Sequence, residues 1–166
     1  MYSVDAEWKG PWPDTGQTKC YDNDSEIPCP EPGEPFYGQD AQYAGPARSY
    51  TKLGQGGVEL ADNAVHVDQG GGWIMTRDNV TGLIWEIKAA ANKDDNYTWQ
   101  DAEDVFVGGL NASNFGGFDD WRLPTIKELS TLVNAGIISG SSHESVGKWW
   151  FWELSHTVQK SQRKCF

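Results

Sequence analysis

The clearest start of a helix in this chain lies within Asp120-Trp121-Arg122-Leu123-Pro124-Thr125-Ile126-Lys127-Glu128-Leu129. Thr125 and Glu128 have the spacing of a capping box, in which each side chain accepts a hydrogen bond from the other residue's backbone amide. Pro124 disfavours an earlier helical start. We therefore predict a helix that begins after Thr125, ends before Gly136 and turns a core face inward, formed by Ile126, Leu129, Leu132 and Val133.

The residues beside this cap are predicted to be structural. Trp121 and Arg122 could stack on and anchor a ligand, but an arginine next to a helix cap is well suited to a partly buried fork of hydrogen bonds. We favour the structural role for this pair. We expect Trp85, in a predicted strand, and Trp99, on a predicted helix, to be structural as well.

Upstream of residue 120 the pattern predicts a small antiparallel meander followed by a helix. Strands are predicted at 65–67, 73–77 and 83–87, with a turn at 78–82. Thr98 is a suitable N-cap for the helix, and Gly108-Gly109 should weaken its end. One apolar stripe along this helix is formed by Trp99, Ala102, Phe106 and Leu110.

Composition divides the chain into three parts. Residues 1–46 hold most of the prolines and nine acidic against two basic residues. They predict an irregular arm, pinned by a Cys20–Cys29 disulfide and by aromatic residues such as Trp8, Trp12, Phe36 and Tyr37. Residues 47–140 are the predicted α+β core, and residues 141–166 form an aromatic and basic tail.

Three cysteines bear on the redox environment. Cys20 and Cys29 lie nine positions apart in a proline-rich loop, where a disulfide would contribute about 2–3 kcal/mol in the chain-entropy model. The alternative is a pair of unpaired cysteines in a reducing compartment. Cys165 is left over, either as a free thiol or as an intermolecular link.

Charge and hydropathy exclude two classes of protein. The net charge is −11 and the isoelectric point about 4.5, which disfavours binding to nucleic acid, because phosphate groups need a basic face. No apolar run approaches the roughly 20 residues that span a bilayer, so we expect no transmembrane segment. Residues 1–5 carry neither the positively charged region nor the apolar run of a secretory signal, so we expect that signal to be absent from this chain.

Two groups of residues are candidates for binding. Asp22, Asp24 and Glu26 alternate like the first ligands of a calcium loop, although the rest of that pattern is missing and solvated turn acids are the alternative. The aromatic cluster of the tail contains Trp149, Trp150 and Trp152, which could form core, an assembly surface or a platform for stacking sugars. No spacing typical of a catalytic or zinc site is present, so we expect no enzyme and no cofactor apart from this candidate calcium.

Four ordered motifs resemble one known family. They are the stretch from Asp120 quoted above and the segments at 76–85, 97–102 and 14–21 with 36–43. Together they resemble the C-terminal domain of bacterial collagen-like adhesins, the Lcl C-terminal domain, over about residues 12–137. A related likeness is to the sulfatase-modifying family, whose fold is related to C-type lectins.

This resemblance implies a C-type-lectin-like α+β fold with two helices packed on a small, twisted antiparallel sheet. It also implies a secreted or surface-attached bacterial domain. Adhesin members are associated with glycosaminoglycan binding, which the acidic charge of this chain argues against. Family members often carry a cysteine near the position of Phe106, and the tail after about residue 137 departs from the family pattern.

We therefore expect a non-enzymatic extracellular or cell-surface module for binding or adhesion, with a glycan or a protein as its partner. The alternative is a structural subunit of an extracellular assembly or fibre. The odd Cys165 and a sheet that lacks strands would favour that alternative and a homo-oligomer.

Overall fold

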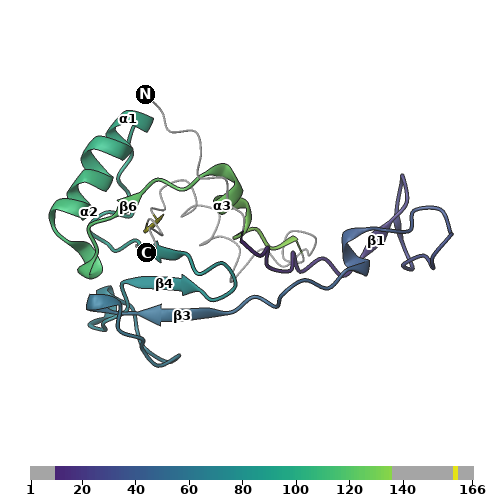
Figure 1. Cartoon of the computed structure of the whole chain (residues 1–166), viewed down its shortest axis with the longest axis horizontal. Coiled ribbons are helices and arrows are strands. Elements are labelled where there is room, and N and C mark those ends of the chain that lie inside the picture. Colours follow the sequence, from purple (N-terminus) through teal and green to yellow (C-terminus); the bar gives the residue numbers. More distant parts are fainter. Residues whose placement is uncertain (1–9, 136–158, 161–166) are drawn as a thin grey trace.

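The computed structural model of the chain describes residues 10–135 and 159–160. Within them the fold is α+β, with a two-stranded sheet in the arm and a five-stranded sheet in the core. In Figure 1 the arm runs out from the core along the long axis of the molecule, and β1 lies near its far end. The pairing is antiparallel throughout both sheets.

The core sheet is centred on a hairpin that the sequence predicted. β4 (Met75–Asp78) and β5 (Ile84–Glu86) pair with Thr76 opposite Trp85. The Asp78 carboxylate accepts hydrogen bonds from the amides of Val80 and Thr81, which fixes the turn. Gly82 closes the turn with a φ of 74°, a left-handed conformation that glycine adopts without strain.

Three further strands of the core sheet were not predicted. The strand order is β3-β4-β5-β7-β6, with β3 at Tyr50–Leu53, β6 at Trp121–Arg122 and β7 at Gln159–Lys160. The two-residue strand β7 therefore lies between β5 and β6. The strand predicted at 65–67 is wrong, because His66 makes a single bridge to Trp73 and a 3-10 turn (η3, Val67–Gln69) begins directly after it.

The first helix begins where predicted and continues further. Thr98 is the N-cap, and its side chain accepts the amide of Asp101. The helix then runs through α1 (Trp99–Asp101), a π-helical segment (η4, Ala102–Val107) and α2 (Gly108–Ala112). Gly108-Gly109 therefore does not end it.

The π-helical segment corrects the apolar stripe predicted for this helix. Its wider turns rotate the start of the helix relative to its end, so positions counted at 3.6 residues per turn no longer share one face. Phe106 and Leu110 are buried as predicted, but Trp99 is 68% exposed.

The second helix, α3 (Ile126–Ser130), has the predicted capping box. It is shorter than predicted, since Thr131 is its C-cap and Gly136 lies outside the described residues. Glu128 and the C-cap Thr131 are buried, whereas Ile126 is 80% exposed. The other predicted core residues, Leu129, Leu132 and Val133, are half-buried. The prediction of an inward Ile126 is therefore wrong.

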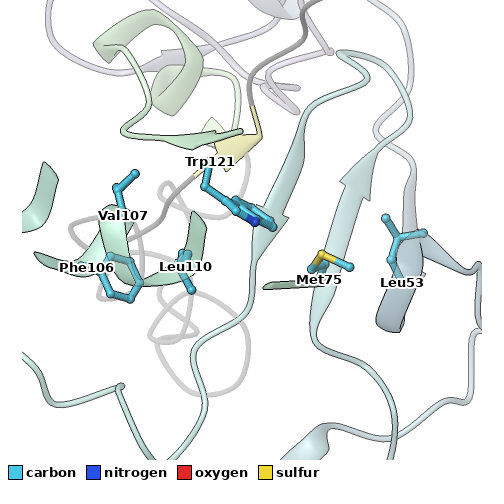
Figure 2. Close-up of a cluster of buried hydrophobic side chains, with 6 residues drawn as sticks. All are labelled: Leu53, Met75, Phe106, Val107, Leu110 and Trp121. Carbon is cyan, nitrogen blue, oxygen red and sulfur yellow. The ribbon is translucent and has the colours of Figure 1, made fainter. Parts of the chain in front are cut away.

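One hydrophobic cluster joins the sheet to the first helix. Figure 2 shows its six buried side chains, which come from β3, β4, β6 and the helix: Leu53, Met75, Phe106, Val107, Leu110 and Trp121. Short 3-10 turns at Asp40–Gln42 (η1), Gln55–Gly57 (η2) and Phe115–Gly117 (η5) complete the described elements. None of the described helices is long and apolar enough to cross a membrane.

Candidate binding surface

The far part of the arm displays four exposed aromatic side chains, which we call the arm tip: Tyr21, Phe36, Tyr37 and Tyr43. Tyr43 is the most exposed of them, at 61%. Exposed aromatic residues gathered in one small segment are unusual on a protein surface that has no partner. The sequence predicted that Trp8, Trp12, Phe36 and Tyr37 would pin the arm. Trp8 lies outside the described residues, and the other three are exposed instead of packed into a core.

A disulfide and a short strand pair hold the base of the arm tip. Cys20 and Cys29 are bonded, as the sequence predicted, and Cys20 is buried. β1 (Cys20–Tyr21) pairs with β2 (Glu26–Ile27) inside the loop that this bond closes. Tyr21 is therefore fixed directly beside a covalent cross-link.

Two glutamine side chains connect the loops of the arm tip. The Gln39 amide accepts from the amide of Tyr21 at 2.8 Å and donates to the carbonyls of Tyr21 and Phe36 at 2.8 and 2.9 Å. Gln42 accepts from the Gly38 amide at 2.8 Å and donates to the carbonyl of Pro30 at 2.5 Å. These bonds hold the aromatic positions in one arrangement without a hydrophobic core of their own.

Phe36 is held in an uncommon backbone conformation. Its φ is 65°, in the left-handed region that a bulky side chain rarely occupies. Such strain costs on the order of 1–3 kcal/mol and is concentrated at sites where function over-determines the geometry. The bond from Gln39 to the Phe36 carbonyl is one of the contacts that stabilise it.

Both ends of the arm are fastened by one carboxylate. Asp14 accepts hydrogen bonds from the amides of Gly16 and Gly45 at 2.7 and 2.9 Å, and its own amide donates to the Pro46 carbonyl. These two backbone hydrogen bonds lower the pKa of Asp14. The arm also reaches the segment that follows α3, because the Ala135 amide donates to the carbonyl of Thr15.

Two of the three predicted calcium ligands have other partners, and no hydrogen bond or ion pair is found for the carboxylate of the third, Asp24, within the described residues. Asp22 accepts the amides of Asp24 and Ser25, which lowers the pKa of Asp22, and Glu26 forms an ion pair with Lys19 at 2.7 Å. The described residues contain no group of three or more acidic, histidine or cysteine side chains placed to bind a metal. The structure therefore corrects the calcium hypothesis, because the Asp22 carboxylate stabilises a turn and the Glu26 carboxylate pairs with Lys19.

The residues predicted to be structural occupy two different environments. Trp85 and Trp121 are buried, and Arg122 and Thr125 converge on the buried Glu128. Arg122 donates to both Glu128 oxygens, at 2.9 and 2.5 Å, and to the carbonyl of Leu123. The candidate ligand-binding residues Trp149, Trp150 and Trp152 lie outside the described residues, as does Cys165.

The sequence carries one signal for exposure at the arm tip. Aromatic residues in a segment dense in proline and glycine have no periodic apolar neighbours to bury them. Such residues are candidates for an exposed surface rather than for a core.

Replacing Gln39 with alanine should loosen the arm tip without unfolding the core. Three hydrogen bonds are lost, each worth about 0.5–1.5 kcal/mol. Hydrogen exchange of the Tyr21 amide should become faster, while exchange in the helix 99–112 stays the same. The control is Gln17→Ala, whose carbonyl bonds the adjacent amides of Thr18 and Lys19; unchanged exchange at Tyr21 in Gln39→Ala would contradict the role given to Gln39.

Comparison with known proteins gives one match. The family model of the Lcl C-terminal domain matches residues 74–164. This range contains the elements from β4 to β7, whereas the arm tip precedes it. The match also extends through the tail, so the expectation that the family pattern ends near residue 137 is wrong. No curated protein and no solved structure matches.

Proposed function

This chain belongs to the Lcl C-terminal domain family, and on that premise we propose that it is a non-enzymatic, extracellular binding module whose recognition surface is the arm tip. The observation that carries the proposal is the display of four exposed aromatic side chains on the arm tip. A disulfide, two glutamine amides and a strained Phe36 fix them before any ligand arrives. Pre-organised aromatic residues contribute contact area at a low cost in conformational entropy.

We propose a glycan without sulfate groups as the ligand. Tyrosine offers an apolar ring face for stacking against a sugar and a hydroxyl for hydrogen bonding. The arm has six acidic residues between positions 20 and 45 and no basic residue there. This charge repels a sulfated polysaccharide and leaves uncharged sugars as the favoured class.

The finer fold assignment belongs to the same proposal. An antiparallel sheet covered by a helix and joined to a long irregular arm supports a C-type-lectin-like architecture. A secreted or surface-attached location is supported by the disulfide, because such bonds persist in oxidising compartments.

The alternative, a subunit of an extracellular fibre, rested on the proline-rich arm, on Cys165, which lies outside the described residues, and on a sheet that lacks strands. The structure bears on the last of these. In the described part of the chain β7 pairs with both β5 and β6, and the Leu60 amide donates to the carbonyl of Lys52 on the outer edge of β3. Both features reduce the edge that another chain could extend. We therefore favour the binding module.

A glycan array with the full chain, run with calcium and with a chelator, tests the proposal. We expect binding to uncharged glycans under both conditions. Tyr43→Ala and Tyr37→Ala should each weaken binding about tenfold, the equivalent of about 1.4 kcal/mol. Trp99→Ala is the matched control, because it removes an exposed aromatic from the core helix.

Two outcomes would contradict the proposal. The first is an array without any signal. The second is binding that the tyrosine variants leave intact or that Trp99→Ala weakens as much as they do. A chain that binds only sulfated glycans would likewise reject the ligand class.

A further inference from the structure

A lysine, a glutamate and an asparagine meet beside the first helix, away from the arm tip. Lys88 and Glu86 have side chains that are 5% and 1% exposed, and their Nζ and Oε2 atoms are 3.2 Å apart. The Asn92 Nδ2 donates to the other oxygen of the same carboxylate, Oε1, at 2.9 Å. The Glu86 carboxylate therefore contacts the amine of Lys88 with one oxygen and the amide nitrogen of Asn92 with the other.

Two stacked aromatic rings lie beside the amine. The Lys88 Nζ lies 3.6 Å from the centre of the Phe106 ring, and that ring stacks on Tyr97 at 5.5 Å. Removing two opposite charges from water costs several kcal/mol per ion. The Glu86 Oε2 makes no hydrogen bond within the described residues and lies 3.2 Å from the Lys88 Nζ, close enough to receive a proton from the amine.

The amide oxygen of Asn92 has a backbone donor. Its Oδ1 accepts a hydrogen bond from the Ala89 amide at 2.9 Å. A backbone donor already aimed at this oxygen stabilises the negative charge that develops there in a tetrahedral intermediate. The turn that carries Asn92 is fixed by a second bond, from the Asn92 amide to the Ala89 carbonyl at 2.9 Å.

From this arrangement we infer that Lys88, Glu86 and Asn92 form a site for an intramolecular isopeptide bond. The chemical class is amide exchange, with Lys88 as the nucleophile, Asn92 as the acyl donor and Glu86 as the catalytic acid and base. The inference is independent of the glycan proposal, since it concerns different residues and a different measurement.

The atoms of this reaction balance without a cofactor. The Lys88 ammonium gives one proton to Glu86, and the neutral Nζ attacks Cγ of Asn92. Glu86 then returns the proton to Nδ2 of the tetrahedral intermediate. The bond from Cγ to Nδ2 breaks, and the new bond from Nζ to Cγ is kept. Ammonia leaves, and Nζ gives a second proton to Glu86. Glu86 passes this proton to the ammonia, which departs as ammonium, and the carboxylate is restored. No group is oxidised or reduced.

The intact mass of the purified, reduced full chain tests this inference. We expect it to be lower than the sequence mass by one ammonia molecule. Trypsin should then fail to cleave after Lys88 and release a peptide 78–93 with the same deficit, in which fragmentation locates a link from residue 88 to residue 92. A wild-type chain at its full mass would overturn the inference without any variant.

Variants distinguish the lysine reaction from cyclisation of the asparagine alone. Lys88→Arg and Glu86→Gln should both keep the full mass, while Lys93→Arg, an exposed lysine in the same turn, should retain the deficit. A deficit that persists in Lys88→Arg would overturn the inference. Loss of one water instead of ammonia, with Lys88 joined to Glu86, would also overturn it, because Asn92 would then not be the acyl donor.

Discussion

Replacing Trp121 with alanine should lower the free energy of unfolding by about 4 kcal/mol, within the range of roughly 3–5 kcal/mol for a buried tryptophan. Trp121 is 3% exposed and belongs to the cluster that joins the sheet to the helix. Its ring packs against Phe115 and Phe118, with centroids 5.7 and 6.3 Å away. The indole nitrogen also donates to the carbonyl of Phe115 at 3.0 Å.

Urea unfolding followed by far-ultraviolet circular dichroism measures this loss. Trp99→Ala is the matched control and should change stability by no more than about 0.5 kcal/mol, because that side chain is exposed. Trp121→Phe should lie between the two variants, since it keeps a ring and loses the hydrogen bond. Equal losses for Trp121→Ala and Trp99→Ala would contradict the proposed core.

Local signals in the sequence predicted the parts of the fold that depend on neighbouring residues. The caps at Thr98 and Thr125 each involve a side chain and an amide three positions later, and both are confirmed. The turn from Asp78 to Gly82 is confirmed for the same reason. The disulfide between Cys20 and Cys29 also joins close positions.

Features that depend on distant partners were missed. β6 has two residues, and it forms a strand because it pairs with β7, almost 40 positions later. The orientation of α3 is likewise a tertiary effect. Since Arg122 and Thr125 hold Glu128 inward, a residue two positions earlier is rotated by about 200° and faces solvent, as Ile126 does.

The arm tip shows the same limit at the candidate site. Its aromatic residues could be read from the sequence, but their exposure follows from bonds such as that between Gln39 and Tyr21, 18 positions apart. No periodic pattern encodes a contact of that kind. Exposure at the arm tip could therefore be established only from the folded arrangement.

Replacing Glu128 with glutamine should lower the free energy of unfolding by about 3 kcal/mol at neutral pH. The loss of one partner in a buried ion pair costs roughly 3–5 kcal/mol, and the partial exposure of Arg122 places this case at the lower end. Glutamine keeps the shape of the side chain, but its NH2 group cannot accept a hydrogen bond. That group would face either the Arg122 guanidinium or the Thr125 amide, which both donate to the carboxylate in the wild type. Glu59→Gln is the matched control, because it breaks an exposed pair with Arg77 and should cost no more than about 1 kcal/mol.

The pH dependence of this loss separates charge from shape. Burial alone would raise the pKa of Glu128, but the hydrogen bonds from Arg122 and Thr125 outweigh it and lower the pKa below its ordinary value of 4.5. A lowered pKa in the folded state means that the ionised carboxylate stabilises the fold above the ordinary value. This stabilisation is lost as the pH falls from the ordinary value of 4.5 through the lowered pKa of the folded state. In urea titrations at successive pH values, the difference between wild type and Glu128→Gln should therefore be constant near neutrality and shrink in acid. A difference that stays the same down to the acid limit would show that Glu128 acts through packing rather than through its charge.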